Sequence, residues 1–315
     1  MRKVLVTGGA GFIGSHIVEQ LLEENYIVSV VDNLCTGNYS NIKNKNVDFY
    51  KCDIISEEFE EAVKEFKPDY IIHQAAQVSV SRSVEETLYD EQVNIRGSLN
   101  VMEAAKKYKV KKIIFASSAA VYGEPQYLPI DEEHVTNTVS PYGLSKFTVE
   151  EYLRLLNKFY GIEYTILRYS NVYGPRQDTK GEGGVVALFA EKVVQGIDVS
   201  IFGDGNQTRD FVYVKDVAGA NIAAIKNGKN EIFNISTNSQ ISINDLLIQM
   251  NLHAESVVEA KYYDTRKGDI VHSVLANTYA KEVLKWTPRY SIQHGIKDTL
   301  EYYLAQNKYN RSVTV

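Results

Sequence analysis

Short apolar runs and amphipathic segments alternate along the first half of the chain. The apolar runs are rich in β-branched residues, which favour strands, and the longer segments space their apolar side chains as helices do. The predicted strands span residues 4–6, 26–31, 47–50, 70–73, 111–116 and 164–168, and the predicted helices span residues 13–24, 57–66, 94–108 and 141–159. This alternation predicts an α/β fold with a parallel sheet covered on both faces. Ligands of such folds bind where the strands reach their carboxyl ends.

The second half of the chain has a weaker pattern. Glycine, aspartate and asparagine cluster in residues 174–184 and 203–206, and such clusters are typical of loops. The sequence contains no internal repeat, no low-complexity block and no obvious linker. We therefore expect a second, smaller unit that is interleaved with the first rather than joined to it end to end.

Composition and charge narrow the classes of function. Hydrophobic residues make up 44% of the chain and charged residues 23%, as in ordinary globular proteins, and the net charge is −6. A chain without a basic excess does not suit nucleic acid or an anionic membrane as its partner. Two cysteines, Cys35 and Cys52, indicate reduced thiols rather than a disulfide framework or a zinc site, so no metal is expected. No apolar stretch approaches the ~20 residues that span a bilayer, and the apolar run after the N-terminus is too short for a signal peptide, so we expect a cytoplasmic protein.

The first turn of the predicted sheet carries a glycine motif. Residues 7–14 read TGGAGFIG, in which Gly9, Gly11 and Gly14 match G-x-G-x-x-G between a strand and a helix. Glycines at this spacing permit a tight turn, close approach to a pyrophosphate, and close packing of the helix on the strand. Asp32 ends the second strand, where a carboxylate accepts both ribose hydroxyls and repels a 2′-phosphate. The pattern predicts a Rossmann-type doubly wound sheet that binds NAD rather than NADP.

Two further strand ends face the same predicted crevice. Asp53 and Ile54 follow the third strand, where a polar and an apolar side chain can edge and cover an adenine. Ala75 and Ala76 follow the fourth strand, and their small side chains let the backbone lie against the cofactor. His73 ends that strand and is interpreted as a hydrogen-bonded structural histidine without a catalytic role.

A tyrosine and a lysine stand four residues apart at the start of the helix predicted over 141–159. This spacing places Tyr142 and Lys146 on one face of the helix. A free tyrosine has a pKa of ~10 and is a poor base at neutral pH, whereas a nearby ammonium and a cationic nicotinamide ring would lower that pKa. Ser118 ends another strand and can hydrogen-bond a reacting hydroxyl. The three residues are therefore candidates for a general base and its supporting groups.

These motifs together resemble those of the extended short-chain dehydrogenase/reductase family. The resemblance rests on residues 7–14, Asp32, Ser118 with the AAVYG segment that follows it, Tyr142 with Lys146, and the NVYGPR segment at 171–176. It runs from the first strand to near residue 300. Within the NAD-dependent epimerase/dehydratase group the chain is most similar to the UDP-glucose (UDP-N-acetylglucosamine) 4-epimerases. The resemblance implies a catalytic Ser118, Tyr142 and Lys146, NAD as the cofactor, and a homodimer formed by the helices at 94–108 and 141–159.

The resemblance also implies a division of the chain and two sets of binding residues. Residues 1–170 with about 212–236 would form the NAD-binding Rossmann domain, and residues 171–211 with 237–315 the nucleotide-sugar-binding domain. The implied cofactor set is Gly8, Gly11, Phe12, Ile13, Gly14, Asp32, Asn33, Asp53, Ile54, Ala75, Ala76, Asn94, Tyr142, Lys146 and Tyr169. The implied substrate set is Ser118, Asn171, Val186, Phe202, Arg209, Arg266 and Ser273.

The implied substrate site recognises a uracil, a diphosphate and a sugar. In the resemblance Phe202 covers the uracil, while Arg209 and Arg266 hold the diphosphate and make a local positive field in an acidic chain. Ser273 takes the place of a gate beside the C2 substituent of the sugar. A tyrosine at that place goes with plain hexoses, and a small residue goes with N-acetyl hexosamines as well. We therefore expect UDP-GlcNAc and UDP-GalNAc to be accepted alongside UDP-Glc and UDP-Gal.

The implied reaction is the inversion of C4 of the hexose. Tyr142 removes the proton of the 4-hydroxyl as hydride leaves C4 for NAD, the 4-keto sugar turns in the site, and hydride returns to the opposite face. Ala119 and Ala120 stand where the resemblance gives dehydratases an Asp-Glu pair and UDP-glucuronate decarboxylases a glutamate, which favours the epimerase. Another NAD-dependent nucleotide-sugar enzyme (a UDP-glucuronate 4-epimerase, decarboxylase, 4,6-dehydratase or 4-ketoreductase) stays open, as does a non-catalytic NAD-binding regulator.

Overall fold

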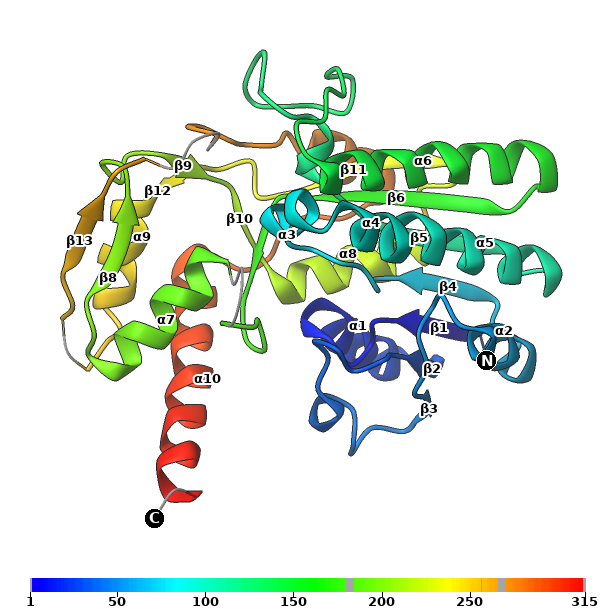
Figure 1. The fold of residues 1–315 in the computed structure, drawn as a ribbon, viewed down its shortest axis with the longest axis horizontal. Helices are drawn as coiled ribbons and strands as arrows, with labels where there is room; N and C mark the ends of the chain where they lie inside the picture. The colour runs from blue at the N-terminus through cyan, green and yellow to red at the C-terminus, as the bar shows by residue number, and fades with distance from the viewer. Residues whose placement is uncertain (1, 180–183, 256, 266–269, 314–315) are drawn as a thin grey trace.

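A seven-stranded parallel sheet lies at the centre of the computed structural model, which describes residues 2–179, 184–255, 257–265 and 270–313 (Figure 1). The strands lie in the order β11-β6-β5-β4-β1-β2-β3, and every neighbouring pair is parallel. They span Lys3–Thr7 (β1), Ile27–Val31 (β2), Val47–Tyr50 (β3), Tyr70–His73 (β4), Lys112–Ser118 (β5), Glu163–Tyr169 (β6) and Glu231–Ile235 (β11). The strand order runs outward in both directions from the β1–β4 pair. Doubly wound sheets bind ligands at the carboxyl ends of the strands at such a reversal.

Helices cover both faces of this sheet, so the predicted α/β fold is confirmed. Helices α1 (Phe12–Glu23) and α8 (Val214–Lys226) pack on one face, and α2 (Glu57–Phe66), α5 (Gly97–Lys107) and α6 (Pro141–Tyr160) pack on the other. Successive residues of a strand face opposite sides of a sheet. Val4 and Val6 accordingly join the core beneath α1 and α8, whereas Leu5 joins the core beneath α2, α5 and α6. Because both faces are buried, the strands read as nearly continuous apolar runs.

A smaller group of elements is built mainly from the second half of the chain and lies to the left of the sheet in Figure 1. It has its own apolar core, formed by α7, α9, α10 and the short strands beside them. The helices span Val185–Gln195 (α7), Ile243–Asn251 (α9) and Ile292–Val313 (α10). The strands pair as β10 (Phe211–Tyr213) with β7 (Asn171–Tyr173), β12 (Ile241–Ser242) with β9 (Thr208–Arg209), and β13 (Ala260–Tyr263) with β8 (Val199–Phe202).

The helix predicted over 94–108 begins differently from the expectation. Two short helices, α3 (Val80–Glu85) and α4 (Thr87–Asp90), precede it, and a π-helical turn over Glu91–Arg96 leads into α5. A π-helical turn widens one turn of a helix, which apolar spacing in the sequence does not reveal. The turn contains Asn94, one of the predicted cofactor residues.

Two absences hold for the described residues. None of their helices is both long enough and apolar enough to cross a membrane. They also contain no group of three or more His, Cys, Asp or Glu side chains that could hold a metal ion.

Candidate active site

The turn between β1 and α1 is built from backbone that approaches its neighbours closely. Gly8 has a φ of 68°, in the left-handed region, and a Cβ atom there would lie 2.8 Å from the backbone nitrogen of Ala75. A Cβ atom on Gly14 would lie 2.1 Å from the carbonyl oxygen of Gly8. Helix α1 begins at Phe12 after its N-cap Gly11, and no side chain caps its first turn. The N–H groups of this turn can therefore serve an anion, and the glycine cradle fits the diphosphate of a dinucleotide.

Asp32 closes the end of β2 beside the glycine turn. Its carboxylate accepts hydrogen bonds from the backbone N–H groups of Ala10 at 2.9 Å and Leu34 at 2.8 Å. Burial raises the pKa of Asp32, and these bonds oppose the rise. Each carboxylate oxygen has a further lone pair, so the side chain can also accept ribose hydroxyls. The choice of NAD over NADP by Asp32 stays a prediction.

The ends of β2 and β3 are joined by a side-chain contact. Asn33 Nδ2 donates to Asp53 Oδ2 at 2.6 Å, so these two predicted cofactor residues lie together. Ile54 is only 4% exposed and belongs to the core beneath α5, where a Cβ atom on Gly97 would lie 2.6 Å from its Cδ1. The structure therefore leaves Ile54 little exposed surface, because its side chain packs against Gly97 of α5, and its contact with an adenine stays a prediction.

The end of β4 lies next to the glycine turn. The N–H of Ala75 donates to the hydroxyl of Thr7 at 3.2 Å, and both Ala75 and Ala76 are half-buried. Tyr169, at the end of β6, is nearly buried, and its hydroxyl accepts hydrogen bonds from Gln74 at 3.1 Å and Asn221 at 2.8 Å. Small side chains at 75 and 76 therefore line the same end of the sheet as the glycine turn.

His73 is held inside the sheet by two hydroxyl groups. Its Nδ1 lies 2.7 Å from the Thr7 hydroxyl, and its Nε2 lies 2.9 Å from the Ser98 hydroxyl. Burial, helped by the nearby Lys146 ammonium, lowers the pKa of His73 to about 3. The ring is therefore neutral over the ordinary pH range, which agrees with its interpretation as a structural histidine.

Ser118, Tyr142 and Lys146 meet where β5 ends beside α6. Ser140 caps α6, so the helix begins immediately before Tyr142. Ser118 is the last residue of β5, and its side chain hydrogen-bonds that of Tyr142. Lys146 Nζ donates to the carbonyl oxygen of Ala116 at 3.0 Å and lies 5.9 Å from the centre of the Tyr142 ring. A serine, a phenol and an amine thus lie together at the carboxyl end of a central strand.

The protonation of this trio differs from the sequence-based expectation. Burial raises the pKa of Tyr142 to about 12; the hydrogen bond with Ser118 opposes the rise, and the Asp90 carboxylate adds to it. Burial lowers the pKa of Lys146 to about 8, against the attraction of Asp90. We expected Lys146 to lower the pKa of Tyr142, but the loss of water around the phenol is the larger effect within the protein itself. A cationic nicotinamide is then the remaining source of a lower pKa.

Asn94 hydrogen-bonds to three segments of the protein itself. Its Oδ1 accepts from the N–H of Gln77 at 2.8 Å, and its Nδ2 lies 2.9 Å from Asp90 Oδ1 and 3.1 Å from Ser145 Oγ. Asn94 is only 2% exposed. Its side chain therefore joins α4, α6 and the loop after β4, and its predicted contact with the cofactor stays a prediction.

Three of the predicted substrate residues come from neighbouring strands and loops. Arg209, in β9, donates to the carbonyl oxygens of Thr208 at 2.9 Å and Val271 at 3.3 Å. The backbone N–H of Ser273 donates to the same Thr208 carbonyl at 3.2 Å, so Ser273 and Arg209 lie on adjacent backbone. Phe202 ends β8, and its ring lies 5.7 Å from that of Tyr263. Their contacts with a nucleotide-sugar stay predictions.

The remaining predicted substrate residues differ in how far they are exposed. Asn171, at the start of β7, is exposed and pairs through its backbone N–H with Asp210. Val186 is only 1% exposed, because α7 turns it into the apolar core of the smaller group, and its contact with a ligand stays a prediction. Arg266 lies outside the described residues.

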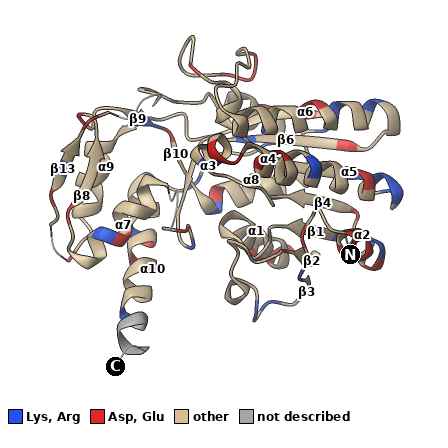
Figure 2. Ribbon diagram, in the orientation of Figure 1, with Lys and Arg blue, Asp and Glu red and all other residues tan. Residues whose placement is uncertain are grey.

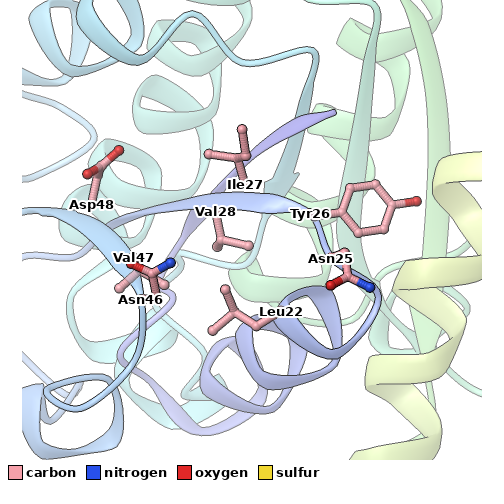
Figure 3. Close-up of a pocket in the computed structure, with 8 residues that line it drawn as sticks. All are labelled: Leu22, Asn25, Tyr26, Ile27, Val28, Asn46, Val47 and Asp48. Atoms are coloured by element: carbon pink, nitrogen blue, oxygen red, sulfur yellow. The ribbon is translucent and has the colours of Figure 1, made fainter. Parts of the chain in front are cut away.

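A pocket lies at the other end of the sheet from this site, and the described residues carry a mixed charge pattern. A pocket of about 380 Å³ lies at the amino ends of β2 and β3, between Leu22 and Asp48 (Figure 3), whereas the glycine turn lies at the carboxyl end of the sheet. Over the described residues, Figure 2 shows Lys and Arg interspersed with Asp and Glu along α5 and α6 rather than gathered in one basic stripe. Recognition of an anion must therefore be local.

Residues 4–236 match the model of the NAD dependent epimerase/dehydratase family. The chain belongs to this family. It is therefore an NAD-dependent enzyme, in agreement with the glycine cradle and the trio beside it.

The chain is similar over nearly its whole length to proteins that are named as 4-epimerases. A UDP-glucose 4-epimerase of Mycolicibacterium smegmatis is 38% identical over 307 residues, which cover 96% of this chain and 98% of that protein. The crystal structure of a UDP-glucose 4-epimerase from Thermotoga maritima with UDP-glucose has 46% sequence identity and a TM-score of 0.92 over 97% of this chain and 99% of that chain. A UDP-N-acetylglucosamine 4-epimerase from Methanobrevibacter ruminantium in complex with UDP-N-acetylmuramic acid has 37% identity and a TM-score of 0.92 over the same shares.

The sequence analysis did not identify several buried polar residues that lie near the candidate site. Glu150 and Arg168 form a buried ion pair at 2.6 Å, and Glu150 also accepts from the Ser117 hydroxyl at 2.5 Å. Asp90, only 1% exposed, lies among the groups that surround Asn94. The sequence could have indicated Glu150 among these residues, because it follows Lys146 by four residues on the same helix and so lies on the same side of it.

Proposed function

We propose that this enzyme inverts C4 of a UDP-hexose, interconverting UDP-Glc and UDP-Gal. The observation that carries the proposal is the meeting of Ser118, Tyr142 and Lys146 at the carboxyl end of β5, at the same end of the sheet as the glycine turn. The similarity to proteins named UDP-glucose 4-epimerases supports the class of substrate.

Each member of the trio has a distinct task. The Tyr142 phenolate takes the proton of the 4-hydroxyl and later returns one to the 4-keto oxygen. Ser118 hydrogen-bonds the reacting oxygen and the phenol, which fixes the distance over which the proton moves. Lys146, anchored on the carbonyl of Ala116, holds a positive charge near the Tyr142 ring. Bound NAD would supply the acceptor and donor of the C4 hydride, and its cationic ring would favour the Tyr142 phenolate.

Two alanines after Ser118 favour simple oxidation and re-reduction. Ala119 and Ala120 lie in a single 3-10 turn whose first residues are capped by the Ser118 hydroxyl. Neither side chain can donate or accept a proton at C5 or C6, so elimination of water or loss of carbon dioxide has no acid or base at these positions. This composition supports the epimerase over a dehydratase or a decarboxylase.

The N-acetyl hexosamines are part of the proposed substrate range. Ser273 is a small residue, half-buried on the backbone next to Arg209. A small side chain beside C2 leaves room for an acetamido group, which a tyrosine would fill. The similar structure named a UDP-N-acetylglucosamine 4-epimerase supports this range.

We also propose that two separate parts of the chain bind the cofactor and the substrate. Residues 1–170 with about 212–236 form the NAD-binding unit, because β11 pairs with β6 and α8 packs against α1. Residues 171–211 with 237–315 form the nucleotide-sugar unit, which has its own core.

Two free cysteines, Cys35 and Cys52, support a cytoplasmic location.

An apolar stripe on α6 supports a homodimer. Leu144, Tyr152, Leu155 and Phe159 are exposed by 53%, 40%, 46% and 67%, and their spacing places them within one side of the helix. Stripes of large exposed apolar side chains on one helix mark protein contacts. A second copy of α6 offers a matching stripe, because a twofold interface joins the same patch on both subunits.

Product analysis tests the proposed reaction. Purified protein is incubated separately with UDP-Glc, UDP-GlcNAc and UDP-GlcA, and the products are separated by chromatography and weighed by mass spectrometry. We expect C4 epimers of unchanged mass from the first two, without net formation of NADH. Loss of water or carbon dioxide from the sugar, or one NADH per product, would refute the epimerase.

A further inference from the structure

Two opposite charges are buried at the reacting trio, the ammonium of its own Lys146 and the carboxylate of Asp90, and neither has an ion-pair partner among the described residues. Asp90, the last residue of α4, is 1% exposed, and Lys146 on α6 is 4% exposed. Within the described residues, the Asp90 carboxylate accepts from the amides of Gln77 and Asn94, and the Lys146 ammonium donates to a backbone carbonyl oxygen, so these partners are all neutral. The nearby buried pair of Arg168 and Glu150 is different, because its charges touch at 2.6 Å. A buried charge without compensation is strongly unfavourable, so Asp90 and Lys146 require an explanation.

A chain of neutral hydrogen bonds connects the Asp90 carboxylate to the start of α6, the helix that carries Lys146. Asp90 Oδ1 accepts from Gln77 Nε2 and from Asn94 Nδ2, both at 2.9 Å. Asn94 Nδ2 also lies 3.1 Å from the hydroxyl of Ser145, the residue directly before Lys146. The Ser145 hydroxyl donates in turn to the Tyr142 carbonyl oxygen at 2.9 Å. Asp90 is thereby fixed against the first two turns of α6, which carry both reacting groups.

We propose that Asp90 is the counter-charge of Lys146 and a positioning residue for the Tyr142–Lys146 pair. Its carboxylate compensates the buried ammonium through space, and the Asn94–Ser145 link holds the carboxylate at a fixed place relative to α6. The assignment rests on the proposed function only in that Tyr142 and Lys146 are taken as the reacting pair. The compensation of charge itself is a property of the folded protein.

The other charged groups around Asp90 leave Lys146 as its natural partner. On α3, Arg82 pairs with Glu86 at 3.0 Å on the surface. On the π-helical turn, Arg96 lies 3.6 Å from Glu91, also on the surface. On β4, His73 is neutral, since burial lowers its pKa to about 3. From α6, Tyr142 and Lys146 both feel Asp90, which raises the pKa of each.

This geometry predicts a direction for the pH dependence of the reaction. A carboxylate favours the protonated form of any neighbouring group, so Asp90 favours the Lys146 ammonium and opposes the Tyr142 phenolate. Its removal must therefore lower the pKa of both groups together. Activity that requires a phenolate and an ammonium then moves to lower pH at its acidic limb and at its alkaline limb alike.

The test compares Asp90→Asn with the matched control Glu91→Gln. Both variants remove one negative charge from consecutive residues, but Glu91 lies on the surface with Arg96. We expect both limbs of the pH profile of kcat/KM to shift down by about 1 pH unit in Asp90→Asn, the low end of ~1–3 units for close charges, and to stay in place in Glu91→Gln. Superimposable profiles for Asp90→Asn and wild type would overturn the proposal.

A spectroscopic titration separates this inference from the proposed function. The ultraviolet absorbance of tyrosine ionisation is followed in NAD-loaded protein, and the Tyr142→Phe titration is subtracted to isolate Tyr142. We expect the Tyr142 transition to occur at lower pH in Asp90→Asn than in wild type. If no UDP-sugar is converted by the wild type but this shift is observed, the proposed reaction fails and the role of Asp90 stands. An unchanged transition would overturn the role of Asp90.

A double-mutant cycle keeps the proposal testable if Asp90→Asn alone fails to fold. Thermal unfolding is measured for Asp90→Asn, Lys146→Met and the double variant. Compensation predicts that Asp90→Asn lowers the unfolding temperature less when residue 146 is methionine, because no buried ammonium is then left alone. An equal loss in both backgrounds, or a double variant that also fails to fold, would contradict it.

Discussion

A Cβ atom on Gly14 would lie 2.1 Å from the carbonyl oxygen of Gly8, so the first turn of α1 rests directly on the turn that precedes it. Gly8 itself has a φ of 68° and lies against the backbone of Ala75 at the end of β4. Three segments of backbone thus touch where β1 and β4 end, without side chains between them. This contact brings the N–H groups of α1 to the place where a diphosphate binds in such sheets.

Gly14→Ala should therefore disturb both stability and cofactor binding. The new methyl group would collide with backbone that cannot move aside, and overpacking of this kind destabilises by about 1–3 kcal/mol. Gly219→Ala is the matched control, because a Cβ atom on this helical glycine of α8 meets nothing closer than 3.7 Å. We expect the control to gain about 0.5–1 kcal/mol from the better helix propensity of alanine. Thermal unfolding with and without NAD measures both variants, and equal behaviour of the two would contradict the packing argument.

His73 should make the protein sensitive to acid. The folded ring has a pKa of about 3, whereas an unfolded histidine binds its proton near pH ~6.5. Between these values the unfolded state binds more protons than the folded state, so stability is full above pH ~6.5 and falls as the pH drops toward 3, by up to ~1.4 kcal/mol per pH unit.

His73→Gln removes this titration and should flatten the stability curve over the same range. The measurement is urea unfolding at a series of pH values for both proteins. An unchanged slope in the variant would show that other groups control the acid sensitivity.

The sheet could be predicted because its strands are buried on both faces and form continuous apolar runs. All six predicted strands exist, with ends shifted by at most two residues. The strand Glu231–Ile235 and the helix Val214–Lys226 went unnamed, because they follow a loop-rich stretch. The short strands of the smaller group pair across long stretches of sequence, and two to four residues carry no readable periodicity.

Some parts of the candidate site could likewise be predicted from the sequence, and others could not. The glycine turn and the Tyr142–Lys146 spacing are local patterns, so the sequence displays them. Asn94 links Asp90 to Ser145. A link between residues so far apart in the chain depends on how α4 packs on α6, which the sequence does not display. Burial raises the pKa of Tyr142 in the protein without its cofactor, and the extent of that burial cannot be inferred from spacing.

Ser273→Tyr should narrow the substrate range. In the proposed site, a tyrosine on the backbone beside Arg209 would fill the space that an acetamido group at C2 needs. We expect kcat/KM for UDP-GlcNAc to fall at least tenfold while that for UDP-Glc changes little. Both substrates are assayed on the same preparation, and an equal loss on both would contradict the gate.

Leu155→Lys should separate the proposed dimer. A lysine within the exposed stripe of α6 would place two like charges in a twofold interface, one from each copy. Ile248→Lys is the control, because Ile248 is also exposed, by 55%, but lies on α9. Analytical ultracentrifugation should give a monomer for the first variant and a dimer for wild type and control. A monomeric wild type would refute the interface outright.

The base assignment is tested most directly by Tyr142→Phe. The substitution removes only the phenolic oxygen and keeps the ring that lies 5.9 Å from Lys146 Nζ. Turnover of UDP-glucose and the amount of NAD bound per chain are measured on the same sample of wild type and variant. We predict that turnover falls by a factor on the order of 10²–10⁴, the usual contribution of a general base, while bound NAD is unchanged. Turnover within a few-fold of wild type would contradict the account, because the proton of the 4-hydroxyl would then have another acceptor.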